Sequence, residues 1–176
     1  LGTFTLEAIA LRAATLMETS VGLNGIQTIA AHLRLLPERD PHQQLHDAAE
    51  IMIETLHDPI VTAALLVRFE LGLLDHLGFG LDLSCCAATG VTQDLVYVSP
   101  KSGRAVSRQA GTPYHDKMLA LPPFLRGTSS FLASEEIRQA FALTGFFLHR
   151  HIYEPRNQPQ PAPREALMRD ILRLAT

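Results

Sequence analysis

The spacing of apolar residues predicts that the first half of the chain is largely helical. Apolar side chains recur every three or four residues in three stretches before residue 58, which is the period of one helix face. Pro37 and Pro41 mark a polar break between the second and third stretches. The three stripes consist of Leu6, Ile9, Ala13, Leu16 and Met17; of Leu23, Ile26, Ala30 and Leu33; and of Leu45, Ala48, Ala49, Met52 and Leu56.

A fourth stretch, residues 60–77, is apolar on almost every side, which is typical of a helix that its neighbours surround. Asp58 and Pro59 suit its N-cap and its first helical position. Because the stretch also contains charged residues, among them Arg68 and Glu70, we expect it to lie in the core of a soluble domain and not to cross a membrane.

Residues 81–130 interrupt the helical period. Residues 95–98 are rich in β-formers, residues 100–103 have the composition of a turn, and residues 105–107 suit a short return strand. Three later prolines disfavour long regular structure before residue 130. The pattern predicts a small hairpin module inserted into a helical protein.

The helical period resumes after residue 131. Ser134, followed by Glu135 and Glu136, favours a helix start. Four prolines within residues 155–163 predict an extended connector before a short closing helix. The apolar face of the long helix consists of Ile137, Ala140, Phe141, Thr144, Phe147, Leu148 and Ile152, and that of the closing helix of Leu167, Ile171 and Leu174.

The predicted fold class is therefore mainly α, a helical bundle domain with a small β-hairpin insertion. Residues 7–80 are predicted to form the first part of the helical domain, residues 81–130 the hairpin module and residues 131–176 the closing helices. Residues 1–6 alternate between apolar and small or polar side chains like the end of a strand. A single strand lacks hydrogen-bond partners, so we expect it to be the last strand of a preceding β domain.

The charge of the chain is divided between its halves. Residues 1–98 hold four arginines against twelve carboxylates, whereas residues 99–176 hold eleven Lys or Arg against six carboxylates. Such a basic half can provide an anion-binding surface although the net charge is −3. Solvated helix faces would explain the same pattern equally well.

No catalytic motif is evident in the sequence, and we expect neither enzymatic activity nor a cofactor. A glycine-rich phosphate loop, an H-E-x-x-H helix and a G-x-S-x-G turn are all missing. His149 and His151 are two residues apart on a predicted helix, so they should point to different sides. The only cysteines, Cys85 and Cys86, are adjacent, which argues against a disulfide scaffold and suits a reducing cytoplasm.

Two four-residue units beside the predicted hairpin have the spacing of zinc knuckles. They are residues 86–89, which read CAAT, and residues 107–110, which read SRQA. A structural zinc site needs four sulfur or imidazole ligands. Of the four ligand positions here, only one holds such a residue, Cys86. The module is therefore predicted to be a degenerate, metal-free zinc finger, held together by Leu95, Val96, Val98 and Val106.

Residues 68–83, which read RFELGLLDHLGFGLDL, resemble the R-F-E-L-x-L-L-x-x-L-G-[FY]-G signature of the RecO family. That family follows the signature with two C-x-x-C pairs around a hairpin, and many members have lost the cysteines. Residues 144–151 also resemble the penultimate helix of RecO proteins. The resemblance covers essentially the whole chain and implies that residues 1–6 are the final strand of an N-terminal OB-fold barrel, which is the usual platform for single-stranded DNA.

The resemblance implies three partners: single-stranded DNA, the protein RecR, and the acidic C-terminal tail of single-stranded DNA-binding protein (SSB). That tail ends in an aromatic residue and its own carboxylate, so binding it requires an apolar pocket beside a cation. We expect Arg68 to pair with the carboxylate and Phe69, Leu71 and Leu74 to lie beside it. Pairing of Arg68 with Glu70 or Asp75 inside the fold is an equally good alternative.

The basic residues of the second half are candidates for phosphate contacts. Such contacts need cations on one accessible surface. The candidates are Lys101, Arg104 and Arg108 on the hairpin module, Lys117 and Arg126 on the loops after it, and Arg150 and Arg156 at the end of the long helix.

The resemblance thus implies a cytoplasmic, nucleoid-associated bacterial DNA repair and recombination mediator. It would bind single-stranded DNA and SSB, and so promote strand annealing and recombinase loading by binding energy alone. Two alternatives stay open: a metal-dependent hydrolase that uses the histidines and Cys86, and a helical protein–protein adaptor without a DNA role.

Overall fold

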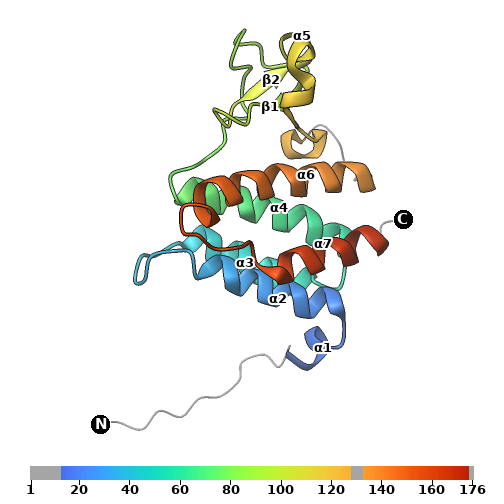
Figure 1. Ribbon diagram of the computed structural model, residues 1–176. Helices are drawn as coiled ribbons and strands as arrows, with labels where there is room; N and C mark the ends of the chain where they lie inside the picture. Colours follow the sequence, from blue (N-terminus) through green and yellow to red (C-terminus); the bar gives the residue numbers. More distant parts are fainter. Residues whose placement is uncertain (1–12, 128–132, 175–176) are drawn as a thin grey trace.

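The computed structural model describes residues 13–127 and 133–174, which form a helical body with a smaller β module beside it (Figure 1). The mainly α fold class is confirmed. The predicted strand at residues 1–6 and the start of the first apolar stripe, Leu6 and Ile9, lie outside the described residues. The helices of the body are α1 (Ala13–Met17), α2 (Ser20–Leu33), α3 (Gln43–Thr55), α4 (Pro59–His76), α6 (Ser134–Leu148) and α7 (Ala162–Leu174).

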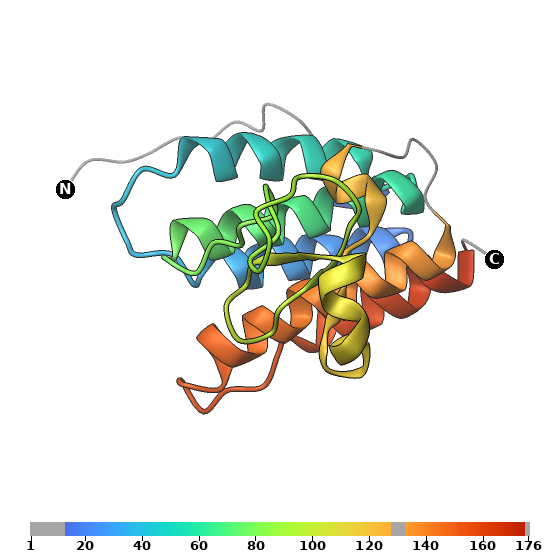
Figure 2. The ribbon, with the colours of Figure 1, turned by 90° about the horizontal axis from the view of Figure 1, so that it is seen from above.

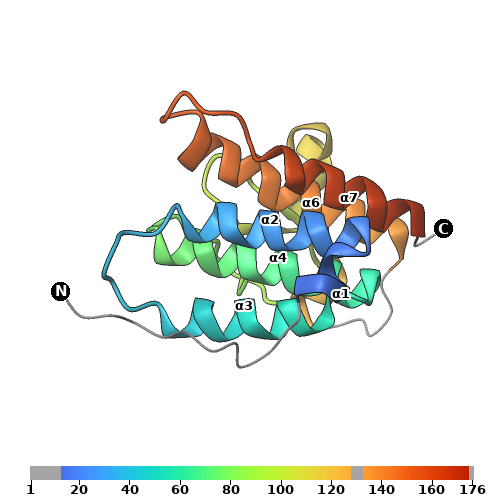
Figure 3. The ribbon, with the colours of Figure 1, turned by 90° about the horizontal axis from the view of Figure 1, so that it is seen from below.

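Helix α4 lies at the centre of the body, as its apolar sequence predicts. It packs against α2, α3, α6 and α7, and Figure 3 shows these helices around it. Asp58 caps α4, because its Oδ1 accepts hydrogen bonds from the backbone N–H groups of Ile60 and Val61. Leu66 and Leu73 on α4 are completely buried. Within the described ranges, no helix combines the length and the apolar character needed to cross a membrane.

A buried ion pair between α4 and α7 links the helices of the body. Arg164 donates from Nε to Glu70 Oε1 at 2.7 Å and from Nη2 to Glu70 Oε2 at 2.9 Å. Glu70 is completely buried and Arg164 is only 4% exposed. His32 on α2 lies 2.9 Å from the same carboxylate, through its Nε2. Three elements that are distant in the sequence therefore meet at one carboxylate.

Arg164 also binds helix α6. Nη2 also donates to the carbonyl oxygen of Phe141 at 3.0 Å and to Thr144 Oγ1 at 3.1 Å. Burial alone raises the pKa of Glu70, but the charge of Arg164 and the hydrogen bond from His32 outweigh it and lower this pKa to about 2. Glu70 is therefore a carboxylate at neutral pH, and its negative charge is compensated inside the protein.

The β module contains a three-stranded antiparallel sheet in the order β2-β1-β3. Strands β1 (Leu95–Val98) and β2 (Ala105–Ser107) are the predicted hairpin. The sequence did not predict the third strand, β3 (Leu119–Ala120). Helix α5 (Arg108–Gly111) and the 3-10 turns η1 (Thr112–Lys117) and η2 (Pro123–Arg126) complete the module, which covers one side of the helical body (Figure 2).

The module contacts the body through β3, which packs against α6, and through its hairpin turn. The backbone of Asp82 forms two hydrogen bonds with the turn, from its N–H to the carbonyl of Gly103 and from the N–H of Ala105 to its own carbonyl. Gly103 has a positive φ of 67° and lies close to the side chains of Leu81 and Phe147. A glycine suits this left-handed turn conformation.

Three local predictions differ from the structure. Ala133, and not Ser134, is the N-cap of α6, so that Ser134 is the first helical residue. The proline-rich connector is shorter than expected, because α7 already begins at Ala162 and a proline is tolerated in a first helical turn. The end of α6 also widens into a π-helical turn, η3 (His149–Tyr153).

We predict that Arg164→Ala lowers the free energy of unfolding by about 3–5 kcal/mol, because it leaves the Glu70 carboxylate buried without its main partner. Denaturant titration at neutral pH measures this difference. The matched control is Arg138→Ala on α6, which removes an exposed ion pair with Glu135 and should have a much smaller effect. Equal losses for the two variants would contradict the central role of the Glu70–Arg164 pair.

Candidate functional site

The two knuckle-like units of the module meet in space. The Sγ atom of Cys86 accepts a hydrogen bond from the backbone N–H of Ser107 at 3.2 Å. The side chain of Thr89 also forms a hydrogen bond with Cys86. Ser107 Oγ in turn accepts a hydrogen bond from the backbone N–H of Ala110 at 3.4 Å. The four former ligand positions are thus linked by hydrogen bonds.

These hydrogen bonds change the acidity of the Cys86 thiol. Burial raises the pKa of Cys86, but the hydrogen bonds from Thr89, Ser107 and the backbone of Ala88 outweigh it and lower the pKa to about 6. The Cys86 side chain is only 1% exposed, so the sulfur faces the interior of the module. Its role in this structure is to accept hydrogen bonds that hold the two units together.

Apolar packing holds the rest of the module. Leu95, Val98 and Val106 are buried, as predicted, whereas Val96 is only half-buried. Phe124 from η2 adds a buried aromatic ring that the sequence analysis did not include.

One group of potential metal ligands occurs on α3. Among the described residues, only His46, Asp47 and Glu50 bring three such side chains together, with their ligand atoms within 4.8 Å of one another. This group was not among the residues predicted from the sequence. All three side chains are exposed, and carboxylate clusters of this kind are common on solvated surfaces.

Arg68 lies at the edge of an apolar groove between α3 and α4. The groove has a volume of about 250 Å³, and none of its lining residues carries a carboxylate. The Nη2 group of Arg68 donates a hydrogen bond to the carbonyl oxygen of Phe124 at 3.2 Å. The groove is lined by Gln44, Leu45, Ala48, Ile51 and Met52 of α3 and by Leu65, Arg68, Phe69, Gly72 and His76 of α4.

The alternative partner of Arg68, Glu70, is engaged elsewhere. Glu70 binds Arg164 and His32 on the other side of α4, so its predicted pairing with Arg68 is wrong. In the part of the chain that the structure describes, no carboxylate lies within ion-pair distance of Arg68. Phe69 contributes to the groove, but Leu74 is completely buried in the core, and half-buried Leu71 does not line the groove.

Four of the seven predicted basic residues lie at the two ends of the sheet. At the hairpin turn, Arg150 Nη1 donates to the carbonyl oxygen of Pro100 at 2.6 Å, which brings Arg150 close to exposed Lys101. At the opposite end, Arg108 pairs with Asp94 at 3.2 Å. Arg126 Nη2 donates to the carbonyl oxygen of Thr92 at 2.8 Å in the same loop.

The other three candidates belong to neither pair. Arg104 forms an ion pair with Asp82, with 3.2 Å between Nε and Oδ2, so its charge is partly compensated. Lys117 is exposed at the end of η1, and Arg156 is exposed in the turn after η3. Of the two pairs, Lys101 with Arg150 has no carboxylate partner among the described residues.

An aromatic stack that was not predicted from the sequence lies beside Arg150. The ring of Phe79 stacks on that of His151 with centroids 4.7 Å apart, and His151 stacks on Phe147 with centroids 5.9 Å apart. Phe79 is 39% exposed. This exposure is a property of the fold, so the sequence held no local signal for the stack.

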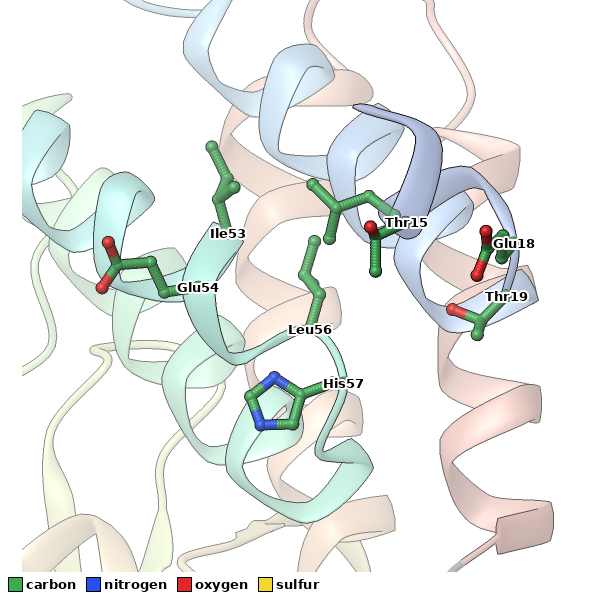
Figure 4. A pocket seen from close by; sticks show the side chains of 8 residues that line it. Thr15, Glu18, Thr19, Ile53, Glu54, Leu56 and His57 are labelled. Carbon is green, nitrogen blue, oxygen red and sulfur yellow. The ribbon is translucent and has the colours of Figure 1, made fainter. Parts of the chain in front are cut away.

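Two further grooves contain no predicted site residue. One lies between α1 and the end of α3, and Figure 4 shows the side chains that line it, among them Thr15, Ile53 and Leu56. The other lies between α6 and α7. It contains Arg138 and Arg164, which are already paired with Glu135 and Glu70.

Comparisons with known proteins agree on one family. Residues 31–160 match the family model described as "Recombination protein O C terminal". The DNA repair protein RecO of Rhizobium etli (strain CIAT 652) is 55% identical over 174 residues, which cover 98% of this chain and 68% of the relative. That of Mesorhizobium japonicum is 58% identical over 169 residues, which cover 96% and 67%. No solved structure gives a significant match.

These relatives, with the fold, define the class of the protein. It is a DNA repair and recombination mediator. The chain belongs to the RecO family. The family predicted from residues 68–83 is therefore confirmed.

We predict that one thiol of the protein titrates near pH 6, because the hydrogen bonds at Cys86 stabilise its thiolate. The ultraviolet absorbance of the thiolate, followed as a function of pH, should show this transition in the wild type and in Cys85→Ser. Cys86→Ser should abolish it. A transition that persists in folded Cys86→Ser would show that the hydrogen bonds at Cys86 do not lower its pKa.

Proposed function

We propose that this chain promotes recombination by binding, without bond chemistry of its own. It engages the C-terminal tail of SSB and single-stranded DNA, and thereby favours strand annealing and recombinase loading in the bacterial cytoplasm, at the nucleoid. RecR is a further proposed partner, on the basis of the family alone. The hydrolase alternative has little support, because Cys86 is buried and occupied by hydrogen bonds within its own module.

The groove between α3 and α4 is the observation that carries this proposal. Its lining is predominantly apolar and includes Phe69, and Arg68 supplies a positive charge at the edge. An acidic tail that ends in an aromatic residue needs both elements, an apolar surface for the ring and a cation for the terminal carboxylate. Because Arg68 is exposed and its neighbour Glu70 is bound by Arg164, the guanidinium can bind an external carboxylate.

We predict that Arg68→Ala weakens binding of an acidic peptide that ends in an aromatic residue and a free carboxylate by about tenfold or more, since a hydrogen bond to a charged group is lost. Fluorescence anisotropy of a labelled peptide measures the affinity. Amidation of the peptide's C-terminus should have a similar effect on the wild type and little further effect on Arg68→Ala.

Arg34→Ala is the matched control for this measurement, because Arg34 is exposed at the end of α2 and does not line the groove. It should leave peptide affinity unchanged. Unchanged affinity in a folded Arg68→Ala variant would exclude the groove as the tail-binding site.

The basic residues support a role in binding single-stranded DNA. Lys101 and Arg150 lie together at the hairpin turn, and Arg108 and Arg126 flank the loop at the other end of the sheet. Arg104, Lys117 and Arg156 add further positive charge to this half of the chain. Contacts between such cations and phosphates release counterions, so binding should weaken steeply as salt is added.

We predict that the salt dependence of single-stranded DNA binding becomes less steep in Lys101→Gln and in Arg150→Gln. The slope of log K against log salt should decrease in magnitude by about 0.7 for each phosphate that the variant no longer neutralises. Titrations of an oligonucleotide at several salt concentrations provide the slopes, with Arg34→Gln as the control. A flat response in the wild type would remove the basic residues from the site.

A further inference from the structure

The exposed ring of Phe79 ends a continuous stack of three rings. Phe79 and His151 are nearly parallel, with an interplanar angle of 9°, and His151 and Phe147 are nearly parallel as well, with an angle of 8°. Phe147 is buried, His151 is half-buried and Phe79 is 39% exposed. The stack therefore runs from the core to the surface and presents aromatic surface to the solvent.

The backbone around Phe79 fixes the position of this ring. Gly78 ends α4 with a positive φ of 85°, and the N–H of Phe79 donates to the carbonyl of Leu74 at 2.8 Å. This is the geometry of a helix end closed by a left-handed glycine. Gly80 passes so close to Asp75 that an added Cβ would lie 2.2 Å from its carboxylate. Phe79 is thus held between two constrained glycines.

Positive charge lies beside the stack. Arg150 precedes His151 in the chain and binds the carbonyl oxygen of Pro100, next to Lys101. The same hairpin turn approaches Phe147 at Gly103. Burial, with a contribution from the charge of Arg150, lowers the pKa of His151 below its ordinary value, so the middle ring is neutral at neutral pH.

We propose that the stack of Phe79, His151 and Phe147, with Arg150 and Lys101, is a site where an unpaired nucleobase of single-stranded DNA stacks on Phe79. The cations contact the phosphates on either side of that base. A combination of aromatic stacking and backbone neutralisation is how single strands are bound without sequence preference. The proposal rests on the single-stranded DNA binding proposed above, and it names the element that contacts a base.

The absence of tryptophan from the sequence allows a direct test. Phe79→Trp introduces a single indole at the end of the stack, and its fluorescence should be quenched when oligothymidylate binds. An abasic strand of the same length should bind through its phosphates without this quenching. Leu23→Trp is the matched control, because Leu23 on α2 has the same exposed fraction of 39% and lies outside the proposed site.

Phe79→Leu supplies the affinity measurement, since it keeps an apolar side chain and removes the ring. It should weaken binding of oligothymidylate by about fivefold or more and leave binding of the abasic strand unchanged. Arg150→Gln should weaken binding of both strands. Circular dichroism of each variant verifies that the fold is retained.

The outcomes separate this inference from the proposed function. If the wild type binds oligothymidylate but Phe79→Leu binds it equally well and the fluorescence of Phe79→Trp is not quenched, base stacking is overturned and single-stranded DNA binding stands. If the wild type binds neither strand, both proposals are overturned. Selective loss of oligothymidylate binding in Phe79→Leu supports both.

Discussion

The buried ion pair between Glu70 and Arg164 is the interaction on which the arrangement of the helices depends. A carboxylate in the centre of a helical core is costly unless charged and hydrogen-bonding partners surround it. Glu70 obtains them from two helices, Arg164 on α7 and His32 on α2. Arg164 in turn binds α6 through Phe141 and Thr144. Apolar contacts are less directional than hydrogen bonds. The hydrogen bonds of this network therefore specify how α2, α4, α6 and α7 are positioned along one another.

Helix α4 uses different sides for stability and for the proposed peptide binding. Glu70 points into the core, while Arg68, two residues earlier, is exposed at the groove toward α3. Phe79, just beyond the end of α4, ends the aromatic stack. The most strongly patterned segment of the sequence thus organises the core, the peptide groove and the edge of the proposed DNA surface. Substitution of a buried residue in this segment will therefore affect both the stability of the protein and its binding, whereas substitution of an exposed residue can affect binding alone.

Sequence patterns predicted the elements whose signals are local. The apolar residues of α4, the cap at Asp58 and the β-formers of residues 95–98 each depend on neighbours in the chain. Strand β3 has only two residues, which is too short to show an alternating pattern. Ser134 is a favourable cap residue, but the structure places the cap one residue earlier, a shift typical of helix boundaries.

The parts of the site that were missed depend on distant partners. Arg164 lies in the first turn of an amphipathic helix, where an arginine is usually exposed, and only the fold shows that Glu70 lies beside it. Leu74 was placed in the peptide pocket because it is near Arg68 in sequence, but the helical period turns it into the core. The stack of Phe79 on His151 joins residues that are far apart in the sequence, so no local pattern could indicate it.

The length of chain between Glu70 and Arg164 has a consequence for how the protein is made. Their side chains meet across a separation of 94 residues, and α7 follows all the other described helices. During synthesis, α2, α3 and α4 leave the ribosome long before Arg164 does. Until then Glu70 has His32 but not its guanidinium partner, so a core formed by these three helices alone is less stable than the complete body. The high sequence separation of this contact therefore favours completion of the body as a late step, in which α7 docks on the helices made before it.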